Sequence, residues 1–194
     1  MEIGSRLRFR SVRPEDAAAI GRLHADSWRR HYRGAYTDSF LDGHVTDVLT
    51  RMWTERLATP LTRADTVLAE DEHGLAGFAH TWFDGDRTWG ALLDNLHVRF
   101  DLKGRGIGTL LMGLAARAVH DWSASTGLCL WVLEQNVDAQ AFYSARGGTC
   151  VERGTVPPPV GDPAHLNGRP ACLRFVWRDT APLRQAAERV VRHG

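Results

Sequence analysis

One stretch of the sequence has the residue types and spacing to bind a phosphorylated ligand. Residues 93–111 read as an apolar strand, a short polar turn, a glycine-rich loop and the start of a helix near Thr109. The glycines of the loop are Gly104, Gly106 and Gly108. They leave several backbone N–H groups unshielded at a helix N-terminus, where unpaired donors and the helix dipole both favour negative charge. Lys103 and Arg105 add positive side chains, so the stretch predicts a phosphate or pyrophosphate site.

The spacing of these glycines argues against two common nucleotide-binding loops. The dinucleotide-binding fingerprint needs a third glycine three residues after the second, and this chain has Thr109 there. A Walker-type loop needs Gly-Lys followed by Ser or Thr, and the sequence contains no Gly-Lys dipeptide. The remaining pattern is a basic residue, two positions, and then Gly-x-Gly.

A second motif follows a helix and a strand later. Residues 128–133 are almost wholly apolar and read as a buried strand. The spacing Asn-x-x-Ala-x-x-Phe-Tyr-x-x-x-Gly then runs from Asn136 through Phe142 and Tyr143 to Gly147. As local structure, this pattern predicts a short helix capped by Asn136 and followed by Gly147. In one interpretation, Phe142 and Tyr143 are merely aromatic residues that face the core.

The two motifs, in this order, resemble the GCN5-related N-acetyltransferases (the GNAT superfamily) over roughly residues 6–178. In that family the basic residue and Gly-x-Gly form the pyrophosphate loop, and Lys103 stands where Arg or Gln is usual. The family's Asn contacts the pantetheine arm, and its Tyr lies beside the thioester sulfur. The resemblance therefore implies acetyl-CoA as co-substrate, with Asn136 and Tyr143 in those two positions.

The resemblance also implies a set of cofactor-binding residues. The backbone of the strand before the loop would pair with the pantetheine amides, and the N–H groups of the loop would take the pyrophosphate. Tyr143 would donate a proton or hydrogen bond to the departing thiolate. The cofactor-binding residues expected are Leu96, His97, Val98, Lys103, Gly104, Arg105, Gly106, Gly108, Thr109, Asn136 and Phe142.

The general base is harder to assign from the residues. The attacking amine must lose its proton, usually to a carboxylate, a histidine or a water chain. Leu92 occupies one position that is often acidic or His in the family, and Asp94, two residues further along the strand, is the candidate base. Strand alternation places Asp94 on the face of Leu96, with His97 on the opposite face unless a bulge re-aims it. Glu134 and base-free catalysis through water are alternatives.

Acceptor recognition should come from residues outside the cofactor motifs. Trp28 and Tyr32 lie four apart on a predicted helix and share a face, so they could wall a pocket for an apolar or cationic amine. Alternatively, Trp28 belongs to the core and Tyr32 to its boundary. Trp82 is a further wall candidate. The loop over residues 157–167 is either a lid or a dimer contact.

Three functions compete at this stage. The first is acetyl transfer from acetyl-CoA to the primary amine of a small or amino-acid-like molecule, by direct attack in a ternary complex. The second is acetylation of a protein or peptide N-terminus. The third is non-catalytic binding of acyl-CoA. Tyr143 speaks against the third function, whereas the absence of a carboxylate at Leu92 speaks for it.

Composition limits the remaining possibilities. The chain has 194 residues, with 24 Lys and Arg against 23 Asp and Glu, so we expect no general affinity for nucleic acid or membrane. The sequence has no apolar run long enough to span a membrane and no signal-peptide core, and we expect a cytoplasmic protein. Three cysteines without metal-ligand spacing predict reduced, buried thiols and no metal site. They are Cys129, Cys150 and Cys172.

The order of elements predicts an α/β fold with a mixed sheet, in one domain over residues 1–178. The family resemblance implies that this sheet is mostly antiparallel, splayed and flanked by helices. The tail, 179–194, is expected to be helical and to pack on its own domain or on a second copy, with Val190 and Val191 among its apolar residues. The predicted strands are 7–12, 66–70, 76–83, a strand ending at 98, 128–133, 149–153 and 172–178. The predicted helices are 14–30, 38–41, 45–57, 109–123, 138–146 and 183–191.

Overall fold

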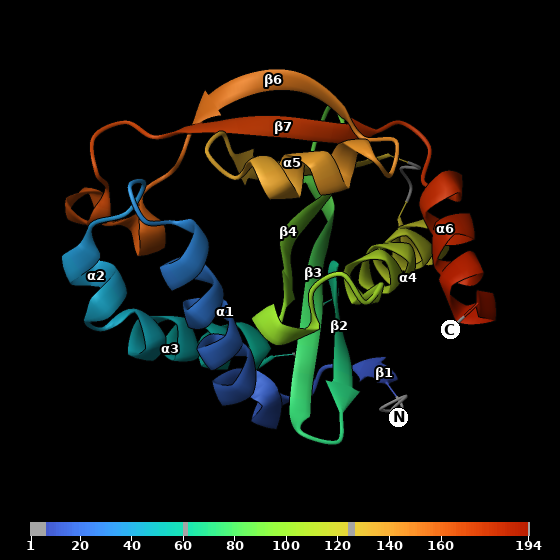
Figure 1. Ribbon diagram of the computed structural model, residues 1–194, viewed down its shortest axis with the longest axis horizontal. Coiled ribbons are helices and arrows are strands. Elements are labelled where there is room, and N and C mark those ends of the chain that lie inside the picture. Colours follow the sequence, from blue (N-terminus) through green and yellow to red (C-terminus); the bar gives the residue numbers. More distant parts are fainter. Residues whose placement is uncertain (1–6, 60–61, 124–126, 194) are drawn as a thin grey trace.

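A computed structural model describes residues 7–59, 62–123 and 127–193, with side chains up to Arg189 (Figure 1). Seven strands form one sheet in the order β1-β2-β3-β4-β5-β7-β6. The strands are β1 (Arg8–Ser11), β2 (Ala64–Asp71), β3 (Gly74–Asp86), β4 (Gly90–Val98), β5 (Leu128–Leu133), β6 (Thr149–Thr155) and β7 (Ala171–Trp177). All neighbours are antiparallel except β4 and β5, so the expected mixed, mostly antiparallel sheet is confirmed.

The sheet splays between β4 and β5. These parallel strands share only two residue pairs, Ala91 with Leu128 and Leu92 with Cys129, at their N-terminal ends. Beyond these pairs the strands separate, and Figure 1 shows β7 and β6 running across the direction of β3 and β4. Because the two strands run the same way, the gap opens at their carboxyl ends. The helices and loops that follow both strands therefore meet at one edge of the sheet.

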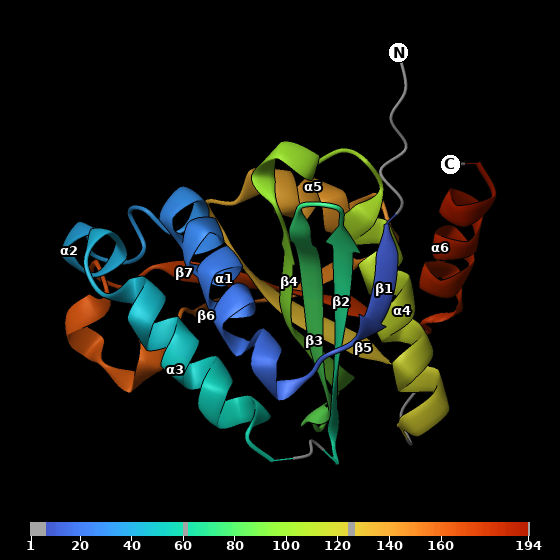
Figure 2. The same ribbon diagram turned by 90° about the horizontal axis from the view of Figure 1, so that it is seen from below.

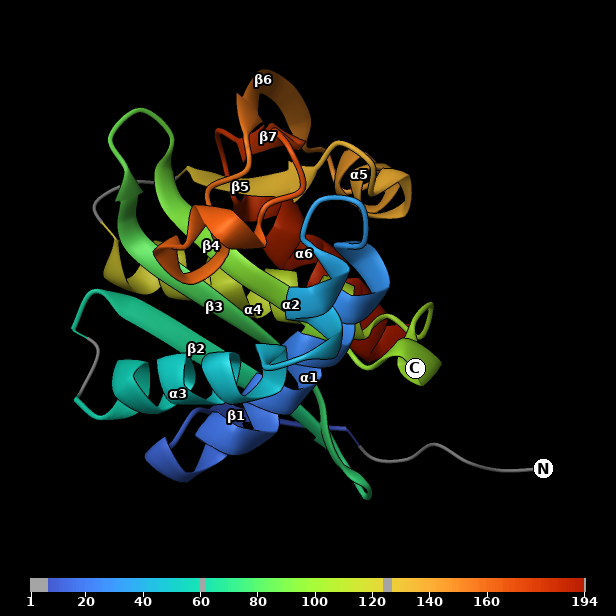
Figure 3. The ribbon, with the colours of Figure 1, turned by 90° about the vertical axis from the view of Figure 1, so that its left-hand side faces the viewer.

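Helices cover both faces of the sheet. The helices are α1 (Ala17–His31), α2 (Asp38–Asp42), α3 (Val45–Leu57), α4 (Ile107–Trp122), α5 (Val137–Ser144) and α6 (Ala181–His193). Figures 2 and 3 show α1 and α3 side by side on one face, with α4 and α6 on the other. Between α1, α3 and the sheet lie buried side chains such as Ile20, Trp53 and Phe78.

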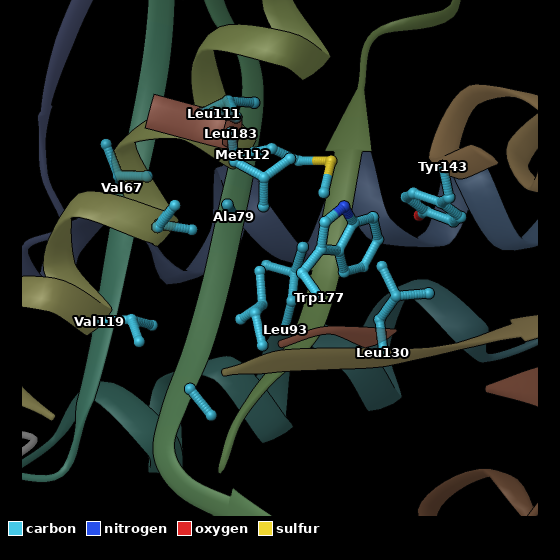
Figure 4. Packing of buried hydrophobic residues seen from close by; sticks show 14 of the residues in the cluster. Val67, Ala79, Leu93, Leu111, Met112, Val119, Leu130, Tyr143, Trp177 and Leu183 are labelled. Atoms are coloured by element: carbon cyan, nitrogen blue, oxygen red, sulfur yellow. The ribbon is translucent and has the colours of Figure 1, made fainter. Parts of the chain in front are cut away.

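The larger core lies between the sheet and α4 (Figure 4). Leu111, Met112 and Val119 of α4 pack there against Leu93 of β4. Leu183 of α6 joins this core, so the C-terminal helix packs on α4 of its own chain. The side chains of Val190 and Val191 lie outside the described residues. No helix in the described part of the chain is long and apolar enough to cross a lipid bilayer.

A β-bulge interrupts β4. Thr81 of β3 pairs with Leu93 and His80 pairs with Asn95, so Asp94 is the extra residue. The bulge shifts the side-chain alternation by one position, and Leu93 now packs on the same core as Leu96. Asp94 instead contacts α3, on the other face of the sheet. The expectation that Asp94 shares the face of Leu96 is therefore wrong.

Two further expectations need correction. Helix α4 begins at Ile107, before the predicted start at Thr109, because Gly106 has the left-handed φ of 83° and serves as its N-cap. Cys129 and Cys172 are buried thiols as expected, but Cys150 is exposed. Its strand, β6, lies at the edge of the sheet, and most of its residues face solvent.

Candidate active site

A cavity of about 510 Å³ occupies the gap between β4 and β5. Its wall comes from the second half of β4, the glycine loop, β5, α5 and the end of α1. Of the predicted cofactor-binding residues, all except Arg105, whose side chain is exposed, line this cavity. Asp94, Tyr143 and Tyr32 line it as well. The fold therefore brings two motifs, separated in the sequence, to one continuous space.

The glycine loop has the shape of an anion cradle. Gly104 and Gly106 have φ values of 78° and 83°, a backbone conformation that other residues rarely adopt. The first N–H groups of α4 follow directly and have no carbonyl partner within the helix. At Gly108, a Cβ would lie 3.1 Å from the ring of Phe142, so glycine lets α5 approach α4 closely. The loop fits the diphosphate of a ligand such as acetyl-CoA.

Arg146, just after α5, is a cavity residue that sequence reasoning missed as a site residue. Its Nε and NH2 donate to Oγ1 of the buried Thr109 at 2.9 and 2.6 Å. Its guanidinium lies 3.6 Å from the ring centroid of Phe142. Burial lowers the pKa of Arg146. Arg146 places a second cation near the loop, and its position four residues after Phe142, just past the end of α5, was the available signal.

Asn136 and Tyr143 occupy the two ends of α5. The Asn136 side chain accepts a hydrogen bond from the backbone N–H of Ala139 at 3.2 Å, which confirms the predicted cap. Tyr143 is 9% exposed, and its ring packs between Phe175 and Trp177 (Figure 4). Burial raises the pKa of the Tyr143 phenol well above its ordinary range, so it stays protonated and can donate.

The three aromatic residues predicted for the acceptor site lie in different places. The Tyr32 ring faces the cavity and packs at 5.3 Å from Trp28, and burial raises the pKa of Tyr32 to about 12. Trp28 itself lies in the core with Tyr36 and is not part of the cavity lining. Trp82 also lies outside that lining, with its ring 5.4 Å from the Arg56 guanidinium. The structure therefore supports the alternative in which Trp28 belongs to the core.

Asp94 is held by a residue from α3. Arg56 NH1 lies 3.2 Å from Asp94 Oδ2 and 3.5 Å from Asn95 Oδ1. The Arg56 guanidinium also lies between two indole rings, 4.8 Å from Trp53 and 5.4 Å from Trp82. This pairing joins residues 38 positions apart, and nothing in the local sequence pattern indicates it.

His97 points to the α1 face of the sheet, as strand alternation predicts. Its Nδ1 lies 2.8 Å from Ser27 Oγ, and its ring packs 4.5 Å from His24. Burial lowers the pKa of His97 to about 3, so this imidazole is neutral near pH 7. His97 and Ser27 both line the cavity.

The end of α1 bridges the gap in the sheet. On the β4 side, Lys103 Nζ lies 2.8 Å from His31 Nε2. On the β5 side, Gln135 Nε2 donates to the carbonyl oxygens of His31 and Arg33, at 3.1 and 2.7 Å. These contacts tie α1 to the segments after both strands and narrow the cavity on that side.

The arrangement can bind a phosphorylated ligand and donate a proton to it. The glycine loop, Lys103 and Arg146 line the same cavity as the Tyr143 phenol and the Asp94 carboxylate. Within the described ranges, no group of three or more His, Cys, Asp or Glu side chains is arranged to hold a metal ion.

Comparison with known proteins gives the family. Residues 25–147 match the family described as Acetyltransferase (GNAT) family. A search of curated proteins finds no match.

Several solved structures share the fold. PaiA N-acetyltransferase from Thermoplasma acidophilum, in complex with coenzyme A, is 16% identical, with a TM-score of 0.67 over 88% of this chain and 99% of that chain. YncA from Salmonella typhimurium, a putative acetyltransferase with its cofactor acetyl-CoA, is 15% identical, with a TM-score of 0.62 over 89% and 94%. NAA60 from Arabidopsis thaliana, with a bisubstrate analogue, is 16% identical, with a TM-score of 0.63 over 88% and 97%. Because the family match covers more than half of the sequence, the chain belongs to the GNAT family of acetyltransferases, enzymes that use acetyl-CoA as acyl donor.

Proposed function

We propose that this protein transfers the acetyl group of acetyl-CoA to the primary amine of a small molecule, by direct attack in a ternary complex. One observation carries the proposal: the glycine loop, Tyr143 and Asp94 all line a single cavity. A cofactor held at the loop and an amine held near Asp94 would thus meet within one cavity.

Acetyl-CoA, when bound, supplies the activated acyl thioester. The N–H groups of the loop and of the first turn of α4 would hold its diphosphate, with Lys103 and Arg146 supplying positive charge. The backbone of Leu96, His97 and Val98, next to the gap in the sheet, would pair with the pantetheine amides. Because β4 and β5 separate beyond their first residues, their facing backbone groups are available for such pairing.

Three groups of the chain would serve the chemical step. Tyr143 remains protonated and would donate to the departing thiolate. The bulge at Asp94 leaves the extra residue outside the strand ladder, and a backbone N–H there would donate to the acyl oxygen. The Asp94 carboxylate would accept the proton of the attacking amine, directly or through water, and Arg56 would hold it in place.

The shape of the cavity favours a small acceptor over a peptide. The contacts of His31 with Lys103 and of Gln135 with the end of α1 close one side of the cavity. Tyr32 and Trp131 line the cavity, and the Arg174 guanidinium lies 4.4 Å from the centroid of the Trp131 ring. A peptide acceptor needs an open groove, whereas aromatic walls of this kind suit a compact amine.

The proposal is tested in two steps. Calorimetric titration with acetyl-CoA should show binding to the parent protein and none to Gly106→Trp. Gly74→Trp is the control, because Gly74 also has a positive φ but is the first residue of β3, next to the turn from β2 and outside the cavity lining. Turnover of a panel of small amines and of peptides then identifies the acceptor. Acetylation of peptides alone would replace the small-molecule acceptor with a peptide, and binding without any turnover would leave a non-catalytic acyl-CoA module.

A further inference from the structure

The contact between Lys103 and His31 joins the glycine loop to α1. The two residues are 72 positions apart, both line the cavity, and Lys103 Nζ lies 2.8 Å from His31 Nε2. An ammonium group has no lone pair, so Lys103 donates and His31 accepts. This geometry requires a neutral imidazole at His31 when the lysine is charged.

The charges around His31 explain this neutral state. Burial and the Lys103 ammonium lower the pKa of His31, and Arg30 on the same helix acts in the same direction. Asp138 on α5 and Asp26 on α1 oppose them, and the net pKa is below the ordinary value. On the β4 side His31 faces His97, which is itself neutral near pH 7.

A phosphate bound at the loop would change these surroundings. It would lie beside Lys103, whose ammonium then donates to phosphate oxygens instead of the imidazole. His31 Nε2 would lose its donor and face an anion, and both changes favour the protonated ring. We propose that His31 binds a phosphate of the cofactor together with Lys103, as an imidazolium, so that acetyl-CoA binding takes up a proton. The inference rests on the assignment of acetyl-CoA to this cavity.

The sign of the pH dependence follows from this uptake. The bound state favours protonated His31 more than the free state does, so the extra affinity is present at low pH and is lost as the pH rises through the pKa of the bound form. An opposite charge at about 4–6 Å shifts a pKa by about one unit or more, so the Kd for CoA should rise about tenfold between pH 5.5 and pH 8.

The experiment is calorimetric titration of the full chain with CoA at pH 7, in two buffers that differ in ionisation enthalpy. The difference in observed heat gives the number of protons taken up for each CoA bound. CoA carries a phosphomonoester that titrates near pH 6, so dephospho-CoA is used in parallel to remove its contribution. His31→Gln is the test variant, because an amide oxygen accepts from Lys103 but does not titrate. His44→Gln is the control, because the His44 side chain is 91% exposed and lies outside the cavity lining.

We expect a measurable fraction of a proton per ligand in the parent and in His44→Gln, and almost none in His31→Gln, with both ligands. An NMR titration of the His31 ring should show a higher pKa in the CoA-bound protein than in the free protein. Equal proton uptake in the parent and His31→Gln, or none in the parent, would overturn the role of His31 and leave the cofactor assignment intact. Absence of CoA binding by the folded parent would overturn the cofactor assignment itself.

Discussion

Replacing Tyr143 with Phe tests the proposed proton donor with little disturbance of the fold. The Tyr143 ring packs against Phe142, Phe175 and Trp177 at centroid distances of 5.4, 5.9 and 6.1 Å, and phenylalanine keeps these contacts. Loss of the hydroxyl alone should change the free energy of unfolding by no more than about 1 kcal/mol. Loss of a general acid should lower kcat by about 10²–10⁴-fold, or about 3–5 kcal/mol of activation free energy.

The assay measures release of the CoA thiol with a saturating amine, alongside the Kd for acetyl-CoA from calorimetry. We expect kcat to fall while the Kd stays within about twofold, because a hydroxyl that acts only in the transition state adds nothing to ground-state binding. Since burial raises the pKa of Tyr143, its donor form persists as the pH rises, and kcat of the parent should show no alkaline loss from this group below about pH 10.

Tyr36→Phe is the matched control. Tyr36 is also buried, at 5% exposure, and lies outside the cavity lining; phenylalanine keeps its ring contact with Tyr32, at a centroid distance of 4.8 Å. Its kcat should equal that of the parent. An unchanged kcat in Tyr143→Phe would refute the proton-donor role. A parallel loss of kcat and of acetyl-CoA affinity would instead indicate that Tyr143 only positions the cofactor.

Arg146→Met removes the hydrogen bonds to Thr109 and one cation from the cavity. Calorimetry should show a Kd for acetyl-CoA about tenfold higher, which corresponds to about 1.4 kcal/mol of binding free energy. An unchanged Kd would exclude a role of Arg146 in binding. Asp71 is buried, and although burial opposes it, the hydrogen bonds from Arg99 and from a backbone N–H lower its pKa. The ionised Asp71 therefore stabilises the fold fully at pH values above the pKa that this carboxyl has in the unfolded chain, and this stabilisation is lost as the pH falls through the lower pKa of the folded protein. Asp71→Asn should thus reduce the fall in Tm between about pH 5 and pH 2. That prediction fails if the parent and the variant lose Tm in parallel. Cys150, the exposed cysteine, should react with iodoacetamide in the native protein, while the two buried cysteines should react only on unfolding. Mass spectrometry of the labelled peptides measures this difference. Equal labelling of all three cysteines in the native protein would contradict the burial of Cys129 and Cys172.

The parts of the fold that depend on local pattern were predictable from the sequence. The apolar positions of residues 45–57 recur at helical spacing, and α3 has those bounds, Val45–Leu57. The glycine loop and the Asn136 cap are also local, since φ values and caps depend on residues within a few positions. The splay of the sheet, in contrast, was expected only from the family resemblance that the two motifs carry.

The contacts that complete the site depend on tertiary packing and could not be predicted. Arg56 reaches Asp94 from 38 positions away, and His31 reaches Lys103 from 72. The bulge at Asp94 arises from the pairing of β4 with β3, which a single strand's alternation does not reveal. Trp28 illustrates the limit of helical periodicity. It shares a face with Tyr32, but Tyr36 and Phe40 pack on the Trp28 ring and bury it in the core.

The hydrogen bonds from Gln135 to the end of α1 have a thermodynamic consequence. Gln135 follows β5, and α1 carries Tyr32 at the acceptor end, so any shift of β5 as the cofactor enters the gap also displaces the acceptor pocket. Binding of the two substrates should therefore be cooperative. Because such linkage is reciprocal, a good acceptor should tighten acetyl-CoA binding by the same factor by which acetyl-CoA tightens binding of the acceptor. The Gln135 side-chain amide would then connect the two sides of the cavity.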